Sequence, residues 1–115
     1  MRSIPTPSND RGAPRASLRT DELEAKARDA SAFLKALAHE ARLIILCQLA
    51  DGEKSVSELT RILKLRQPTI SQQLARLRED NLVETRRDGK NIYYSLGRPE
   101  VREIIATLYR SFCQR

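Results

Sequence analysis

One segment limits the fold of this chain more than any other: a polar helical stretch followed closely by a basic turn. Residues 67–74 read Gln-Pro-Thr-Ile-Ser-Gln-Gln-Leu, and residues 86–90 read Arg-Arg-Asp-Gly-Lys. The proline suits the first turn of a helix, where its missing N–H donor has no partner to lose. Ile70, Leu74 and Leu77 recur at helical spacing and predict a buried face. The Thr, Ser and Gln side chains then lie outside the buried face, where they can contact a binding partner.

A β-hairpin is predicted over residues 83–95, because Asp-Gly is a strong signal for a two-residue type I′ turn. With Asp88 and Gly89 in the loop, three pairs of residues face each other: Arg87 with Lys90, Thr85 with Ile92, and Val83 with Tyr94. Val, Thr, Ile and Tyr side chains then share one face, as a hairpin packed against a helix requires.

Capping residues and apolar periodicity predict four further helices. The first begins after Thr20, an N-cap candidate, and the second covers about residues 40–50. The third begins at the S-x-x-E capping box that starts with Ser55 and runs to about Leu63, and Pro99 opens the last. The fold class is therefore mostly α with a small β-hairpin: a winged helix-turn-helix in the order α-α-α-α-β-β-α.

The first and last helices each carry a long apolar stripe. The two stripes consist of Leu23, Ala27, Ala30, Leu34 and Leu37, and of Val101, Ile104, Ile105, Leu108 and Phe112. The central helices and the hairpin can close a small core without them. The stripes therefore predict a homodimer through the first and last helices, about a two-fold axis.

The charge of the chain favours an anionic partner, since the net charge is +6. The segment from Arg61 to Ile92 holds eight basic and four acidic residues, so part of the excess lies on the predicted helix and hairpin. A helix-turn-helix places its second helix in the major groove of DNA, where Gln, Ser and Thr can bond to base edges and basic residues to phosphates. The residues expected to contact DNA are Arg66, Gln67, Thr69, Ser71, Gln72, Gln73, Arg76, Arg86, Arg87 and Lys90.

Two other classes of function fit the sequence less well. An enzyme is not expected, because the sequence has no paired catalytic carboxylates, Ser-His-Asp set or glycine-rich phosphate loop, and no cofactor is expected either. A winged helix that binds protein instead of DNA is the remote alternative, and a steep salt dependence of DNA binding would distinguish the two.

The chain is long enough for one domain. Residues 1–18 contain three prolines and few side chains that could join a core, so we expect a disordered arm before a winged-helix and dimerisation domain at residues 19–115. The longest apolar block, residues 43–47, falls far short of the roughly 18 residues that span a bilayer. With no secretory signal at the N-terminus, we expect a cytoplasmic location and no membrane partner.

Cys47 and Cys113 are the two cysteines. A cysteine that follows Leu43-Ile-Ile-Leu46 is usually an inert small hydrophobe, whereas Cys113 lies near basic residues that favour its thiolate. The residues alone leave structural and redox roles open. A metal site is not expected, because two thiols are too few for a thiophilic ion and the only histidine, His39, is placed to cap or pack a helix.

The motifs together resemble the ArsR/SmtB winged-helix repressors. The likeness runs from about Ala32 to Leu96 and includes Leu37-Ala-His-Glu-Ala-Arg42 and the residues 67–74 described above. Three residues depart from the family pattern: Gln73 stands where histidine is frequent, Arg66 where a serine cap is frequent, and Asn81 where glycine is usual. The resemblance implies a homodimer that binds an imperfectly palindromic operator and releases it on meeting an inducer.

The cysteines and the Gln-Pro-Thr-x-Ser-Gln-Gln-Leu helix are similar to the persulfide-sensing BigR/SqrR branch of this family. The resemblance implies that Cys47 and Cys113 are the sensing pair, that the dithiol form binds DNA, and that a persulfide or polysulfide bridges the thiols. Peroxide or another electrophile, or a thiophilic metal, stays open as the inducer.

Overall fold

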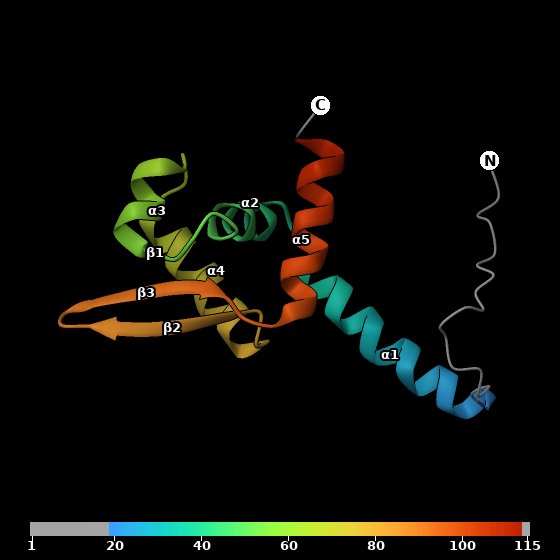
Figure 1. Ribbon diagram of the computed structural model, residues 1–115. Coiled ribbons are helices and arrows are strands. Elements are labelled where there is room, and N and C mark those ends of the chain that lie inside the picture. The colour runs from blue at the N-terminus through green and yellow to red at the C-terminus, as the bar shows by residue number, and fades with distance from the viewer. Residues whose placement is uncertain (1–18, 114–115) are drawn as a thin grey trace. The chain divides into compact units, whose positions relative to one another are not determined.

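The computed structural model describes residues 19–113, and the arm predicted at residues 1–18 lies outside them. Five helices and three strands follow one another: α1 (Thr20–Leu37), α2 (Glu40–Leu49), β1 (Lys54–Ser55), α3 (Val56–Ile62), α4 (Gln67–Glu79), β2 (Val83–Asp88), β3 (Asn91–Leu96) and α5 (Pro99–Phe112) (Figure 1). The described residues divide into two units, with the boundary between Ser31 and Ala32, inside α1.

Capping residues mark where α2 and α3 begin and where α4 ends. Ser55 and Glu58 form the predicted capping box: the Ser55 hydroxyl accepts from the Glu58 N–H at 3.1 Å, and the Glu58 carboxylate accepts from the Ser55 N–H at 2.8 Å. His39 caps α2, its Nδ1 accepting from the Ala41 N–H at 3.2 Å. Asn81 follows α4 with a φ of 62°, a conformation that asparagine tolerates better than most residues.

The sheet has three antiparallel strands in the order β1-β3-β2, one more than the sequence predicted. β1 is only two residues long and pairs with β3, with Lys54 opposite Tyr94 and Ser55 opposite Tyr93. Ser55 therefore ends a strand and caps α3 at once, which ties the start of α3 to the sheet.

The predicted hairpin register was wrong by two residues. Asp88 pairs with Asn91 and Thr85 with Tyr94, so the loop is Gly89-Lys90 rather than Asp88-Gly89. Gly89 has a φ of 65°, and glycine in the first loop position is the pattern of a type II′ turn. Because the side-chain period of a strand is two, a shift of two residues leaves the same side chains on the inner face.

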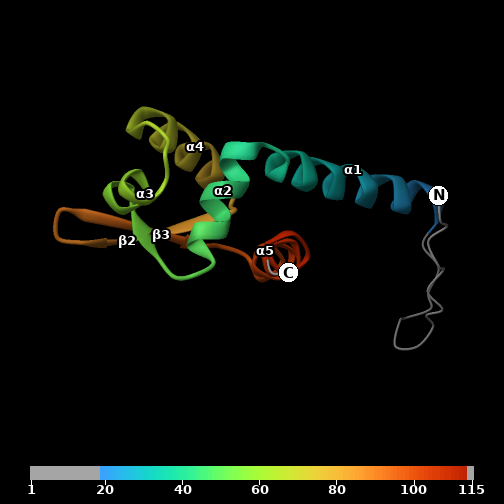
Figure 2. The ribbon, with the colours of Figure 1, turned by 90° about the horizontal axis from the view of Figure 1, so that it is seen from above.

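The core of residues 32–115 lies around α2. Its buried side chains come from all the helices and from the inner face of the sheet: Leu37, Ile45, Leu46, Leu49, Leu59, Ile70, Leu74, Leu77, Leu82, Val83, Leu96, Val101 and Ile105. α2 packs against α4, α5 and β3, and Figure 2 shows it between α4 and α5. The prediction that α2 is the central core helix is therefore confirmed.

The predicted apolar stripes are divided between the core and the surface. Leu37, Val101 and Ile105 are buried, whereas Leu34 is 55% exposed and Phe112 is 76% exposed. The dimer through these helices stays a prediction. Among the helices at residues 19–113, none combines the length and apolar character that crossing a bilayer requires.

Candidate DNA interface and cysteine pair

The polar face of α4 is set by the side chains that the helix buries. Ile70, Leu74 and Leu77 are fully buried, so Gln72 and Arg76 lie on the outermost face. The other predicted contacts on this element are Gln67, which is exposed, and Thr69, Ser71 and Gln73, which are half-buried on its flanks. Arg66 is the exposed N-cap and makes no side-chain capping bond.

Two glutamines of this face are already hydrogen-bonded within the protein. Gln67 Nε2 lies 3.0 Å from the Ser71 hydroxyl oxygen, one turn along α4. Gln73 Oε1 accepts from Arg42 Nε of α2 at 2.9 Å, and Arg42 Nη1 donates to the carbonyl oxygen of Ala36 at 2.9 Å. Arg42 thus connects α4 to the carboxyl end of α1. Sequence reasoning gave this arginine no role, although it lies in a motif that carried the resemblance.

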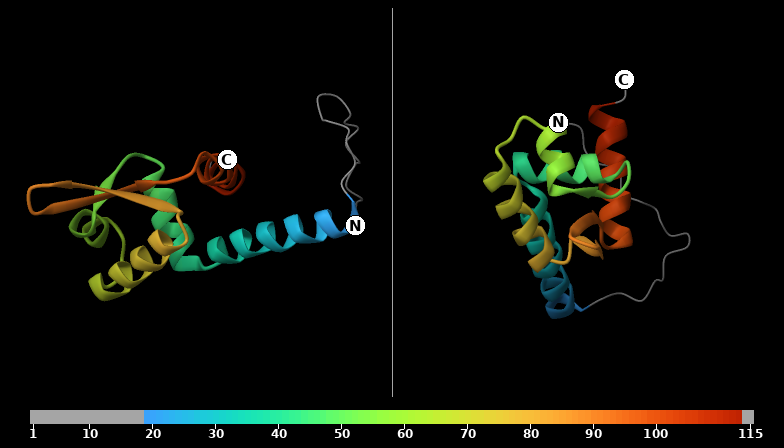
Figure 3. Two further views of the ribbon diagram at one scale, coloured as in Figure 1. Left: turned by 90° about the horizontal axis from the view of Figure 1, so that it is seen from below. Right: turned by 90° about the vertical axis from the view of Figure 1, so that its left-hand side faces the viewer.

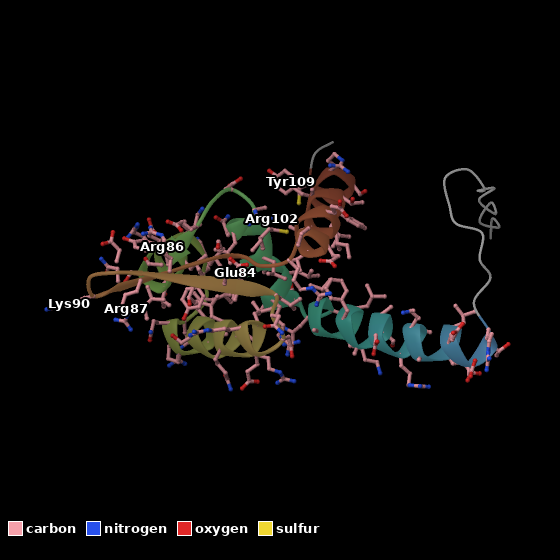
Figure 4. The ribbon with its side chains drawn as sticks, turned by 60° about the horizontal axis from the view of Figure 1, so that its bottom comes forward. Glu84, Arg86, Arg87, Lys90, Arg102 and Tyr109 are labelled. Carbon is pink, nitrogen blue, oxygen red and sulfur yellow. The ribbon has the colours of Figure 1, made fainter. Side chains whose placement is uncertain are left out.

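The wing, residues 83–96, carries the remaining predicted contacts. The hairpin extends beyond α3 and α4 (Figure 3), and Figure 4 shows Arg87 and Lys90 near its loop end. Both side chains are exposed, and neither forms an ion pair within the part of the chain that the structure describes. Their charges are therefore available to DNA phosphates.

Arg86 is held differently from its neighbour on the wing. Its Nε donates to both Glu53 carboxylate oxygens, at 3.1 and 3.2 Å, and its guanidinium lies over the Tyr93 ring, 4.9 Å from the centroid. Asp88 adds a second carboxylate, 3.9 Å away. The hydrogen bond from Arg86 lowers the pKa of Glu53, and Glu53 raises the pKa of Arg86 in turn. Glu53 was not predicted, because only the fold brings the loop before β1 within reach of the Arg86 side chain. Tyr93 was missed because the predicted register placed Asn91 opposite Arg86, where the structure has Tyr93.

The two cysteines lie on helices that pack together. Cys47 is half-buried in α2, while Cys113 is the exposed C-cap of α5, its N–H donating to the Tyr109 carbonyl oxygen at 2.8 Å. Both are free thiols. Burial raises the pKa of Cys47, and the negative charge of Cys113 raises this pKa further.

No group of three or more His, Cys, Asp or Glu side chains is placed to hold a metal ion in residues 19–113. His39 serves as the N-cap of α2, one of the two roles that the sequence predicted for it.

Comparison with known proteins identifies a family. Residues 39–85 match the model described as "Bacterial regulatory protein, arsR family". The chain is 48% identical over 91 residues to the biofilm growth-associated repressor of Agrobacterium fabrum, covering 79% of this chain and 78% of that protein. It is 44% identical over 104 residues to the transcriptional activator HlyU of Vibrio cholerae, covering 90% of this chain and 94% of that protein. The structure of reduced HlyU from Vibrio cholerae N16961 matches with a TM-score of 0.78 and 46% identity, covering 82% of this chain and 99% of that one.

Proposed function

The chain belongs to the ArsR family of bacterial regulatory proteins, which are DNA-binding regulators of transcription and not enzymes, and we propose that it is a repressor whose affinity for DNA is controlled by Cys47 and Cys113. In this proposal the dithiol dimer binds an operator. A sulfur bridge between the two cysteines releases it. The observation that carries the switch is that the two free cysteines lie on helices that pack against each other, Cys47 in α2 and Cys113 at the end of α5.

The DNA-binding part of the proposal rests on the exposed surface of α4 and the wing. α4 would enter the major groove with Gln67, Gln72 and Arg76 toward the bases, while Arg87 and Lys90 neutralise phosphates. A second copy of the chain would cover exposed apolar residues of α1 and α5 such as Leu34 and Phe112. Two recognition helices would then meet half-sites about 34–36 Å apart on an imperfect palindrome.

The order of the thiol reactions follows from burial. Cys113 is exposed, whereas burial makes Cys47 less accessible and raises its pKa, which lowers the fraction of its reactive thiolate. Cys113 therefore reacts first. Its thiolate attacks the central sulfur of an organic trisulfide, expelling one thiolate and leaving a mixed trisulfide on the protein.

Cys47 completes the bridge in a second exchange. Its thiolate attacks the sulfur next to the Cys113 Sγ and expels the second thiolate, so that one added sulfur atom joins the two side chains. The protein thiols lose two electrons and two protons, and the organic trisulfide is reduced to two thiols. The bridge constrains α5 against the core helix α2, which alters how two protomers joined through α5 can lie. A structure of the V. cholerae relative is described as that of reduced HlyU, which supports a redox role for the cysteines in this proposal.

Operator affinity measured by fluorescence anisotropy tests the proposal. The wild type, C47S and C113S are each treated with dithiothreitol, an organic trisulfide or hydrogen peroxide. We expect the trisulfide to weaken wild-type binding about a hundredfold, within the range of allosteric couplings, and to leave both variants bound. Mass spectrometry should then find a cross-linked peptide pair heavier than the plain disulfide by about 32 Da per added sulfur.

Each other result changes the proposal in a defined way. An unchanged wild-type affinity after trisulfide removes the switch. Release by peroxide with a plain disulfide, and no release by trisulfide, replaces the polysulfide inducer with an oxidant. A transcription reporter that falls when the gene for this protein is deleted would make the protein an activator, as HlyU is described, rather than a repressor.

A further inference from the structure

We propose that Arg42 fixes which end of the Gln73 side chain faces DNA, so that Gln73 offers N–H donors and selects guanine over adenine. The inference rests on the operator binding proposed above, but it does not depend on the cysteine switch. It concerns the hydrogen bond from Arg42 Nε to Gln73 Oε1, which is 2.9 Å long.

The orientation of the Gln73 amide is dictated by its partner. The oxygen and nitrogen of a glutamine side chain are hard to tell apart by shape, and their assignment depends on what they bond to. A guanidinium group has five N–H donors and no acceptor. The Gln73 atom that meets Arg42 is therefore the carbonyl oxygen, and the amide nitrogen with its two N–H donors is left for another partner.

Arg42 is itself held in place. Its second hydrogen bond, from Nη1 to the Ala36 carbonyl oxygen at 2.9 Å, anchors the guanidinium to the backbone of α1. Arg42 and Gln73 are both half-buried, and a charge-assisted bond that is partly shielded from water is among the stronger hydrogen bonds in a protein. Turning Oε1 toward a base would break this bond.

The consequence is a preference between the two purines. Glutamine reads adenine by accepting from N6 while donating to N7 in the major groove. With Oε1 held by Arg42, Gln73 can donate but is a poor acceptor. Guanine presents two adjacent acceptors, O6 and N7, to such a donor, whereas adenine presents one acceptor and an N6 amino group that would stay without a partner.

Gln73 lies among side chains that we propose to contact DNA. Together with Gln72, Arg76 and Arg42 it lines an open hollow of about 270 Å³ on the surface of α4. Gln72 is exposed and has no side-chain hydrogen bond within the described residues, so its amide can still turn to read adenine. Gln72 is thus the matched control.

The test is selection of bound sequences from a DNA library randomised across one half-site. Q73A and Q72A first identify the base pair that each glutamine reads, as the position where discrimination is lost. At the Gln73 position we expect the wild type to favour guanine over adenine by about tenfold, a typical value for a good base contact. In R42M, which frees Oε1, the preference at this position should shift toward adenine and the Gln72 position should not change.

Two further variants keep the test decisive if R42M is poorly folded. R42K retains a donor for Oε1 and should keep the guanine preference in weakened form. Q73E keeps the pairing with Arg42 but has no donor to offer, so its guanine preference should disappear.

Four results would overturn the inference: wild-type selection of adenine at the Gln73 position, no base position that responds to Q73A, a folded R42M with an unchanged purine preference, or a guanine preference that survives in Q73E. If the wild type binds no sequence in the library, operator binding itself fails and the inference falls with it. If the wild type binds but lacks the guanine preference, only the inference fails.

Discussion

Replacing Glu53 with glutamine should make DNA binding by this protein more sensitive to salt. Glu53 accepts hydrogen bonds from Arg86 at 3.1 and 3.2 Å, and Asp88 lies 3.9 Å from the same guanidinium. Two carboxylates thus offset the positive charge of Arg86 in the protein without DNA. The neighbouring Arg87 makes no ion pair among the described residues, and β-strand alternation places it on the opposite face of the wing.

The expected magnitude comes from counterion release. Each phosphate neutralised by a basic side chain contributes about 0.9 to the slope of the logarithm of affinity against the logarithm of salt concentration. Losing Arg87 from both protomers of a dimer should therefore make the slope shallower by about 1.8. R86Q should change it by less than half of that amount, because Arg86 is already paired. E53Q should make the slope steeper, by up to about 1.8, because it frees one Arg86 charge per protomer.

The assay is operator affinity measured from low to moderate salt for the wild type, E53Q, R86Q and R87Q. E84Q is the matched control, since Glu84 is an exposed carboxylate of β2 that forms no ion pair within residues 19–113 (Figure 4). It corrects for the general gain from removing negative charge near DNA. Equal losses in R86Q and R87Q, with E53Q no different from E84Q, would show that Arg86 is an ordinary phosphate contact and would refute the reasoning.

Three further predictions concern the cysteines, the core and pH. Iodoacetamide should alkylate Cys113 before Cys47 near neutral pH, because Cys113 is the exposed thiol. C113S should lower the pH at which Cys47 becomes reactive, because it removes a charge that raises the pKa of Cys47. Mass spectrometry of the two cysteine-containing peptides checks both results. L74A should lower the free energy of unfolding, measured by urea denaturation, by about 2–5 kcal/mol, since Leu74 is fully buried on the inner face of α4. A loss below about 1 kcal/mol, roughly the cost of a conservative core change, would contradict this packing. The pKa of Glu53 is lowered in the folded state, so its pair with Arg86 stabilises the fold at pH values above the unfolded-state pKa. This stabilisation is lost as the pH falls through the folded-state pKa. The difference in stability between the wild type and E53Q should therefore shrink in acid.

Local sequence signals predicted the helices of this fold well, because each depends on residues close in the chain. The capping box at Ser55 and the proline in the first turn of α4 set their helix ends without help from distant residues. The strand β1 gave no such signal, since two residues, Lys54 and Ser55, are too few to show a period and their pairing partners lie in β3. The hairpin loop was misplaced because Asp-Gly and Gly-Lys both allow a tight turn, and the pairing of whole strands decides between them.

The candidate DNA interface shows the same division. Residue type and helical spacing identified the polar side chains of α4, but they could not show which hydrogen-bonding groups are already occupied. Arg42 and Gln73 are 31 positions apart, and Arg86 is 33 positions from Glu53. Only the folded chain shows that one pair orients an amide and the other offsets a charge.

The position of α2 suggests how the thiols and the recognition helix can influence each other. α2 carries both Cys47 and Arg42, and on a helix rising about 1.5 Å per residue they lie roughly 7.5 Å apart along its axis. A bridge that shifts α2 would therefore move the guanidinium that holds Gln73 Oε1. The side-chain amide resonances of Gln73 should accordingly differ between the dithiol and bridged forms of the wild type and coincide in R42M. If they coincide in the wild type as well, bridging acts only through the spacing of the two protomers, and α2 does not connect the cysteines to base recognition.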